Sequence, residues 1–82
     1  MTAAQRPGAA ARHEQAFLIH LVGGGSLKMM LDARDLSDIQ HALRQHRALI
    51  GRHVFESEIG LEESMHALVP AARVQMVIDC EE

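Results

Sequence analysis

The chain has 82 residues, 48% of them hydrophobic, with two Phe, no Trp, no Tyr and a net charge of −3. This length allows one small domain, and the charge gives no overall attraction for nucleic acid or anionic lipid. No apolar run approaches the roughly 18 residues of a membrane-spanning helix. The scarcity of aromatic side chains argues against a platform that stacks single-stranded bases.

The first 14 residues include Pro7, Gly8 and five alanines, and after Met1 they contain no large apolar side chain. Such a segment cannot bury enough surface to offset the entropy of ordering it. We therefore predict a disordered tail over residues 1–14 and a single domain over residues 15–82. Cys80 is the only cysteine, which fits a reducing compartment. We expect a cytoplasmic protein without a membrane partner.

The first two predicted elements form a β-hairpin. Residues 17–22, FLIHLV, are a short apolar run rich in residues that favour strands. Residues 27–32, LKMMLD, place Leu27, Met29 and Leu31 on one face. The loop between the two runs, residues 23–26, is Gly-Gly-Gly-Ser. Two such runs joined by a short glycine-rich loop are typical of a hairpin.

The clearest helix is predicted over residues 35–47. Leu36, Ile39 and Leu43 recur at the spacing of one helical face. Asp35 is a natural N-cap, because its carboxylate can accept from the first unpaired backbone amides. Basic residues in the last turn favour the negative end of the helix dipole.

A strand follows over residues 49–55, LIGRHVF, with Ile50 and Val54 on one face and Leu49, His53 and Phe55 on the other. The next segment, residues 56–64, is polar and acidic, and Gly60 within it indicates a turn. We interpret this acidic segment as a loop.

Residues 61–69 are compatible with two structures. Leu61, Met65 and Leu68 match a helical face. A residue that precedes a proline, here Val69, is biased towards extended backbone. We favour a strand over residues 65–69, and the helix stays an alternative.

A turn at residues 70–72 and a last strand then complete a C-terminal β-meander. In that strand Val74, Met76 and Ile78 alternate with polar residues and are predicted to share one buried face.

The predicted fold class is α+β. The element order β-β-α-β-β-β, or β-β-α-β-α-β if residues 61–69 are helical, is not the alternating pattern of a parallel sheet. A small antiparallel sheet of about four or five strands with one helix packed on it is the natural architecture. A core this small is marginally stable alone, and self-association is one way to stabilise it.

The last third of the chain, MHALVPAARVQMVI at residues 65–78, is similar to the closing strand-turn-strand segment of Sm-like small barrels. The predicted helix after the second strand departs from the Sm order, and the similarity includes no diagnostic residue. It therefore assigns no family to the chain.

Charge is segregated along the chain. Residues 39–55 contain three arginines, three histidines and no acid, whereas residues 56–63 contain four glutamates and no base. The candidate binding residues in the basic stretch are Arg44, Arg47, Arg52, His46 and His53. Such a patch can bind phosphate or pair with the acidic stretch of a second copy. The third interpretation is a solvated helix face beside an acidic loop.

No constellation of catalytic residues emerges, so we predict that the chain is not an enzyme. Its serines lie in no nucleophile-elbow context, and Cys80 lies among acidic residues rather than beside an activating base. Six histidines are present, but none makes an HxH or HxxxH pair. We predict no cofactor and no metal site. A metal site assembled from separate elements stays an alternative.

These observations favour a non-catalytic, self-associating interaction module, of the kind that serves as an accessory or regulatory subunit. The expected partner is another copy of the chain, in a dimer or a higher homo-oligomer. The alternative is a small RNA- or DNA-binding protein that uses the basic stretch 39–55.

Overall fold

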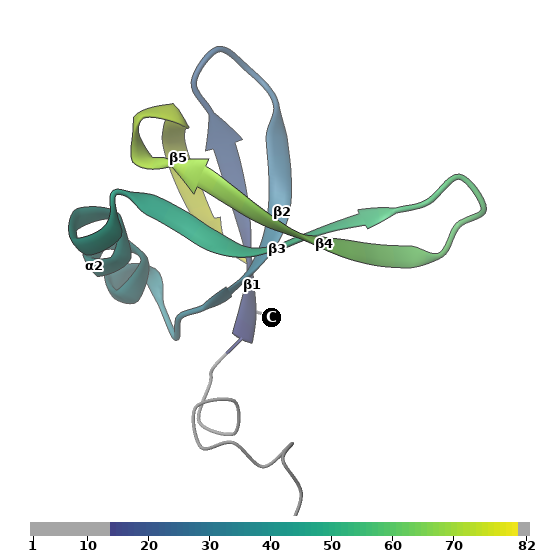
Figure 1. Cartoon of the computed structure of the whole chain (residues 1–82), viewed down its shortest axis with the longest axis horizontal. Coiled ribbons are helices and arrows are strands. Elements are labelled where there is room, and N and C mark those ends of the chain that lie inside the picture. The colour runs from purple at the N-terminus through teal and green to yellow at the C-terminus, as the bar shows by residue number, and fades with distance from the viewer. Residues whose placement is uncertain (1–13, 81–82) are drawn as a thin grey trace, which may run out of the picture.

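The first two strands form the predicted hairpin (Figure 1). The computed structural model describes residues 14–80. In it, β1 (Glu14–Leu21) pairs antiparallel with β2 (Ser26–Asp32), and Phe17 lies opposite Met29. The three glycines of the connecting loop all have positive φ angles, 92°, 108° and 90°. Only glycine adopts such angles without strain, which explains the run of three.

The predicted tail lies outside the described residues, except for its last residue. Glu14 belongs to β1, where it lies opposite Asp32 and its carboxylate accepts hydrogen bonds from Arg52.

The predicted helix is confirmed as α2 (Leu36–His46). The Asp35 side chain accepts a hydrogen bond of 3.0 Å from the backbone amide of Asp38, as an N-cap does. At the other end Arg47 adopts a left-handed conformation, with φ of 59°, and its amide donates to Leu43 O. This geometry ends the helix, and Ile39 is the helix residue that is fully buried.

The two central segments are strands, β3 (Ala48–Glu56) and β4 (Glu62–Pro70), paired antiparallel. The helical alternative for residues 61–69 is therefore wrong. The acidic loop is also shorter than predicted, because Glu56 pairs with Glu62 and Phe55 with Glu63. Cross-strand hydrogen bonding outweighs the weak strand preference of glutamate here.

The C-terminal strands do not form the predicted meander. After β4 the chain makes a 3-10 turn, η2 (Ala71–Arg73), and continues as β5 (Val74–Asp79). β5 pairs with β1, so the strand order is β4-β3-β2-β1-β5. β4 and β5, which are consecutive in the chain, thus lie at opposite edges of one antiparallel five-stranded sheet. The sheet curls and brings these two strands together at η2 (Figure 1).

The core lies on the inner face of this curled sheet. Its largest fully buried side chains are Phe17, Ile19, Met29 and Leu49. Ile39 of α2 joins the same cluster, so the helix packs over the core. The described residues therefore form a small single α+β domain, and no helix among them is long and apolar enough to cross a membrane.

The buried face of β5 differs from the prediction. Val74 packs against the core as predicted, but Met76 and Ile78 are 51% and 40% exposed, and Val77 packs against the core in their place. The cause is an irregularity in the β1–β5 pairing between His20 and Leu21. It shifts the register by one residue, and a shift of one residue exchanges the two faces of a strand.

The first prediction concerns the helix start and its pH dependence. Asp38 Oδ2 accepts from the Arg34 backbone amide at 2.9 Å, and this bond is the main reason that the pKa of Asp38 lies below its ordinary value of 3.8. A carboxyl with a lowered pKa stabilises the fold above its unfolded pKa, and the contribution disappears as the pH falls through the folded pKa.

We therefore expect Asp38→Asn to be less stable than the unmodified protein at neutral pH. The difference should begin to shrink below pH 3.8, where Asp38 of the unfolded chain becomes protonated, and shrink further as the pH falls through the lower pKa of the folded protein. Urea unfolding followed by far-ultraviolet circular dichroism at neutral pH and at about pH 3 measures both differences. A difference in unfolding free energy that is the same at both pH values would contradict the assignment.

The second prediction concerns the close approach of β3 to β2 at Gly51. A Cβ atom added at Gly51 would clash with the backbone oxygen of Met30 and lie 2.6 Å from Leu31 Cδ2. Gly51→Ala should lower the free energy of unfolding by about 1–3 kcal/mol, the usual cost of overpacking. The exposed β5 residue Gln75 provides the control, Gln75→Ala, because it adds no atom to a packed region. Equal stability of the two variants would argue against the close approach.

Candidate functional site

The sheet has two open edges. Among residues 14–80, β4 has β3 as its only neighbouring strand and β5 has only β1. An edge strand presents backbone donors and acceptors along its free side, and another strand can pair with them. The two edges converge at η2 and belong to different strands, so each offers a different sequence to a partner.

Exposed apolar side chains accompany both edges. Met65 and Leu68 of β4 are 62% and 59% exposed, and Met76 and Ile78 lie on β5. On β3, Ile50 lies directly opposite Leu68 and is 64% exposed. Large apolar side chains that stay in contact with water next to unpaired backbone are typical of an interaction surface.

A hairpin projects beyond the sheet. The β2–β3 pairing reaches its last pair at Lys28 and Val54, so residues 55–63 pair only with one another. We call this two-stranded segment the β3–β4 arm (Figure 1). Its turn is well defined, because Ser57 N–H donates to Leu61 O at 2.8 Å and Gly60 N–H donates to Ser57 O at 2.9 Å.

The β3–β4 arm is apolar at its tip and acidic along its sides. Ile59 and Leu61 are 79% and 58% exposed, and Ile59 is the most exposed large apolar residue of the described chain. All four glutamates of the acidic stretch lie on the arm: Glu56, Glu58, Glu62 and Glu63. The arm therefore carries four negative charges around two exposed apolar side chains.

An apolar cavity of about 290 Å³ lies where α2 meets the start of β3. We call it the α2 pocket. Its apolar lining comes from β2, the connection after it, α2 and β3: Leu31, Ala33, Ile39, Ala42, Ala48, Leu49 and Ile50. His46 and Asp32 are its two titratable lining residues.

The structure groups only part of the predicted basic patch. Arg44 and His46 lie in the last turn of α2, and Arg47 follows as the C-cap. Arg52 and His53 are consecutive residues of β3, so their side chains point to opposite faces of the sheet. The His53 ring packs near Phe55, with 5.3 Å between the ring centres.

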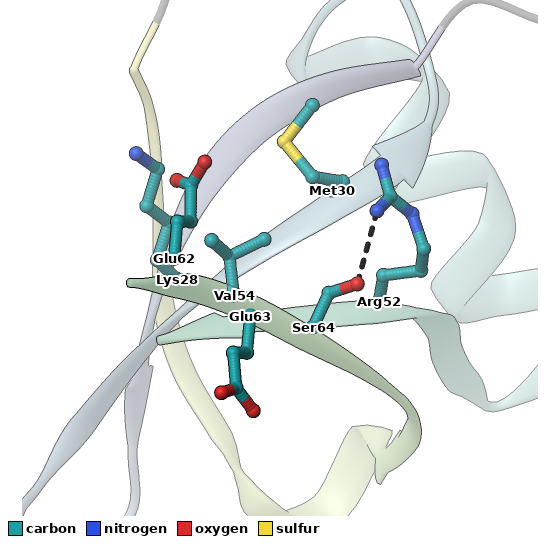
Figure 2. A pocket seen from close by; sticks show the side chains of 7 residues that line it. All are labelled: Lys28, Met30, Arg52, Val54, Glu62, Glu63 and Ser64. Atoms are coloured by element: carbon teal, nitrogen blue, oxygen red, sulfur yellow. Dashed lines mark hydrogen bonds between the residues drawn. The ribbon is translucent and has the colours of Figure 1, made fainter. Parts of the chain in front are cut away.

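Arg52 is engaged on the outer face of the sheet. Its Nη2 donates to Glu14 at 2.7 Å and its Nε donates to the other Glu14 oxygen at 3.0 Å. Its Nη1 donates to Ser64 Oγ at 3.1 Å, and Figure 2 shows the two side chains pointing towards each other. The hydrogen bonds that Glu14 accepts from Arg52 are the main reason that the pKa of the Arg52 guanidinium lies above its ordinary value. All three guanidinium nitrogens therefore already have a partner.

Arg52 lines a shallow cavity of about 260 Å³ on this outer face. The other lining residues are Lys28, Met30, Val54, Glu62, Glu63 and Ser64 (Figure 2). Cations and carboxylates are mixed in this lining, so the cavity has no single charge that would select an anion.

No group of three or more His, Cys, Asp or Glu side chains among residues 14–80 could hold a metal ion. Cys80 is an exposed free thiol at the end of that range, beside β5. Its amide donates to Ala16 O, which continues the β1–β5 pairing by one residue.

Sequence reasoning missed the β3–β4 arm and the α2 pocket. The arm had a signal, since Phe55 and Leu61 flank a turn containing Gly60, as expected for a hairpin. The pocket had none, because it is assembled from three elements that are separated along the chain.

In comparisons with known proteins, no family model, no curated protein and no solved structure matches this chain.

Proposed function

We propose that the protein is a non-catalytic, self-associating interaction module, suited to the role of an accessory or regulatory subunit. The observation that carries the proposal is the pair of open sheet edges, β4 and β5, each accompanied by exposed apolar side chains. Pairing with the edge of another copy supplies the missing backbone hydrogen bonds and covers the apolar side chains.

The two edges differ, and this has a consequence for assembly. If β4 of one copy pairs with β5 of the next, the contact is head-to-tail, and repetition gives a closed ring or an open chain. If one edge pairs with itself, the result is a two-fold dimer. In both cases the small core of each copy gains buried apolar surface, which stabilises the fold.

The third prediction tests the edges. The purified protein should have a mass that is a multiple of 9.0 kDa in light scattering at about 100 μM, where an interface of ordinary size is saturated. A monomeric unmodified protein under these conditions would remove the basis of the proposal.

The double variant Leu68→Lys/Ile78→Lys should shift that mass towards the monomer. Both side chains are exposed, so charge at these positions disturbs the edges without burying a lysine in the core. The control is His41→Lys/Gln45→Lys, which adds the same number of lysines at exposed residues of α2. The control variant should keep the mass of the unmodified protein.

The alternative function, binding of RNA or DNA through residues 39–55, is supported by the cluster of Arg44, His46 and Arg47 at the end of α2. It is weakened by the engagement of Arg52 with Glu14 and Ser64. It is also weakened by the carboxylates beside Arg52 in the outer cavity.

The fourth prediction separates the two functions. The chain has no Trp and no Tyr, so co-purified nucleic acid would dominate the ultraviolet spectrum near 260 nm. The interaction module should give a clean spectrum and show no salt-dependent shift with mixed oligonucleotides. Binding that weakens with salt and is lost in Arg44→Gln/Arg47→Gln would favour the alternative instead.

A further inference from the structure

The β3–β4 arm and the α2 pocket have complementary properties. The arm presents two exposed apolar side chains, Ile59 and Leu61, surrounded by four glutamates. The pocket presents an apolar lining with His46 and Asp32 as its titratable residues, and Arg47 directly precedes the lining residue Ala48. The arm is a projection with an apolar tip and acidic sides, and the pocket is an apolar cavity beside the basic end of α2.

The two surfaces cannot meet within one molecule. Residues 48–50 of β3 line the pocket, whereas residues 55–56 at the other end of the same strand belong to the arm. Figure 1 shows α2 and the arm at opposite ends of the longest axis of the domain. The extended strand between them holds them apart, so an arm can reach only the pocket of another copy.

The arm is ordered before it binds. Its strands pair from Phe55 and Glu63 outwards, and its turn is closed by hydrogen bonds between Ser57 and Leu61 and between Ser57 and Gly60. A rigid projection loses little conformational entropy on docking, which favours association.

Charge complementarity favours a second copy over other occupants. The arm carries Glu56, Glu58, Glu62 and Glu63 without a basic residue between them, and the end of α2 carries Arg44 and Arg47 beside His46. Opposite charges around an apolar contact orient the partners during encounter and exclude a reversed arrangement.

We propose that the apolar tip of the β3–β4 arm of one copy binds in the α2 pocket of another copy. The inference rests on the proposed self-association and adds a second contact, separate from the β4 and β5 edges. Because the arm and the pocket are different surfaces, the contact is either made twice in a two-fold dimer that exchanges arms or repeated head-to-tail from copy to copy.

Mass measurements on arm variants test this contact. Ile59→Ser/Leu61→Ser removes both apolar anchors at exposed positions, so the fold should be retained, as checked by circular dichroism. The association constant should fall about tenfold or more, the usual effect of removing central apolar anchors. The matched control, Ile59→Leu, keeps the tip apolar and should associate as the unmodified protein does.

Disulfide trapping tests which surfaces meet. Two single-cysteine variants are prepared in a Cys80→Ser background, one with Ile59→Cys and the other with His46→Cys, and are mixed in the presence of oxidised glutathione. The proposal predicts an intermolecular disulfide between positions 59 and 46, identified by mass spectrometry. A Val22→Cys variant in place of His46→Cys is the control and should give at least about tenfold less of the mixed disulfide.

The outcomes distinguish the two proposals. An oligomer whose mass is unchanged in Ile59→Ser/Leu61→Ser, with no 59–46 disulfide, overturns the arm contact and leaves self-association through the edges. In that case the arm serves a partner of another kind. A monomeric unmodified protein overturns both proposals, whereas an oligomer that loses mass in the arm variant and forms the 59–46 disulfide supports both.

Discussion

The fold depends on a short connection between two strands that lie at opposite ends of the sheet. Only the three residues Ala71–Arg73 separate β4 from β5, and the backbone from the last residue of β4 to the first of β5 spans at most about 14 Å. The sheet must therefore curl until its two edges meet at this end. Two backbone hydrogen bonds hold the turn, from Ala71 N–H to Arg47 O at 2.9 Å and from Val22 N–H to Arg73 O at 2.8 Å.

The curl determines which apolar side chains are buried. The inner face encloses Phe17, Ile19, Met29 and Leu49, and α2 adds Ile39 to this cluster. The outer face and the edges keep large apolar side chains in contact with water, including Ile50, Leu68 and Met76. A chain of this length has too little volume to bury all of its apolar residues in one core. Contact with another copy can bury the apolar side chains that stay exposed, and the proposed function rests on these side chains.

β3 connects the two surfaces of the second proposed contact. Its first residues line the α2 pocket, and its last residues enter the β3–β4 arm. Gly51 lets this strand pass close to the backbone of Met30, so the pocket end of β3 stays packed against β2. The opposite end is free to project, because the β2–β3 pairing reaches no further than Lys28 and Val54. β3 thus holds the α2 pocket and the β3–β4 arm in a fixed relative position.

Local signals in the sequence determined the elements themselves. The glycines at 23–25 supply the positive φ angles of the hairpin loop, and Asp35 caps α2. The charge segregation between residues 39–55 and 56–63 was also visible in the sequence. The tertiary structure decided the strand order, the buried face of β5 and the projection of the arm. These features depend on pairing between segments distant in sequence, such as β1 with β5 and its one-residue register shift. Local periodicity carries no information about such pairing, because a strand presents the same alternation to any neighbour.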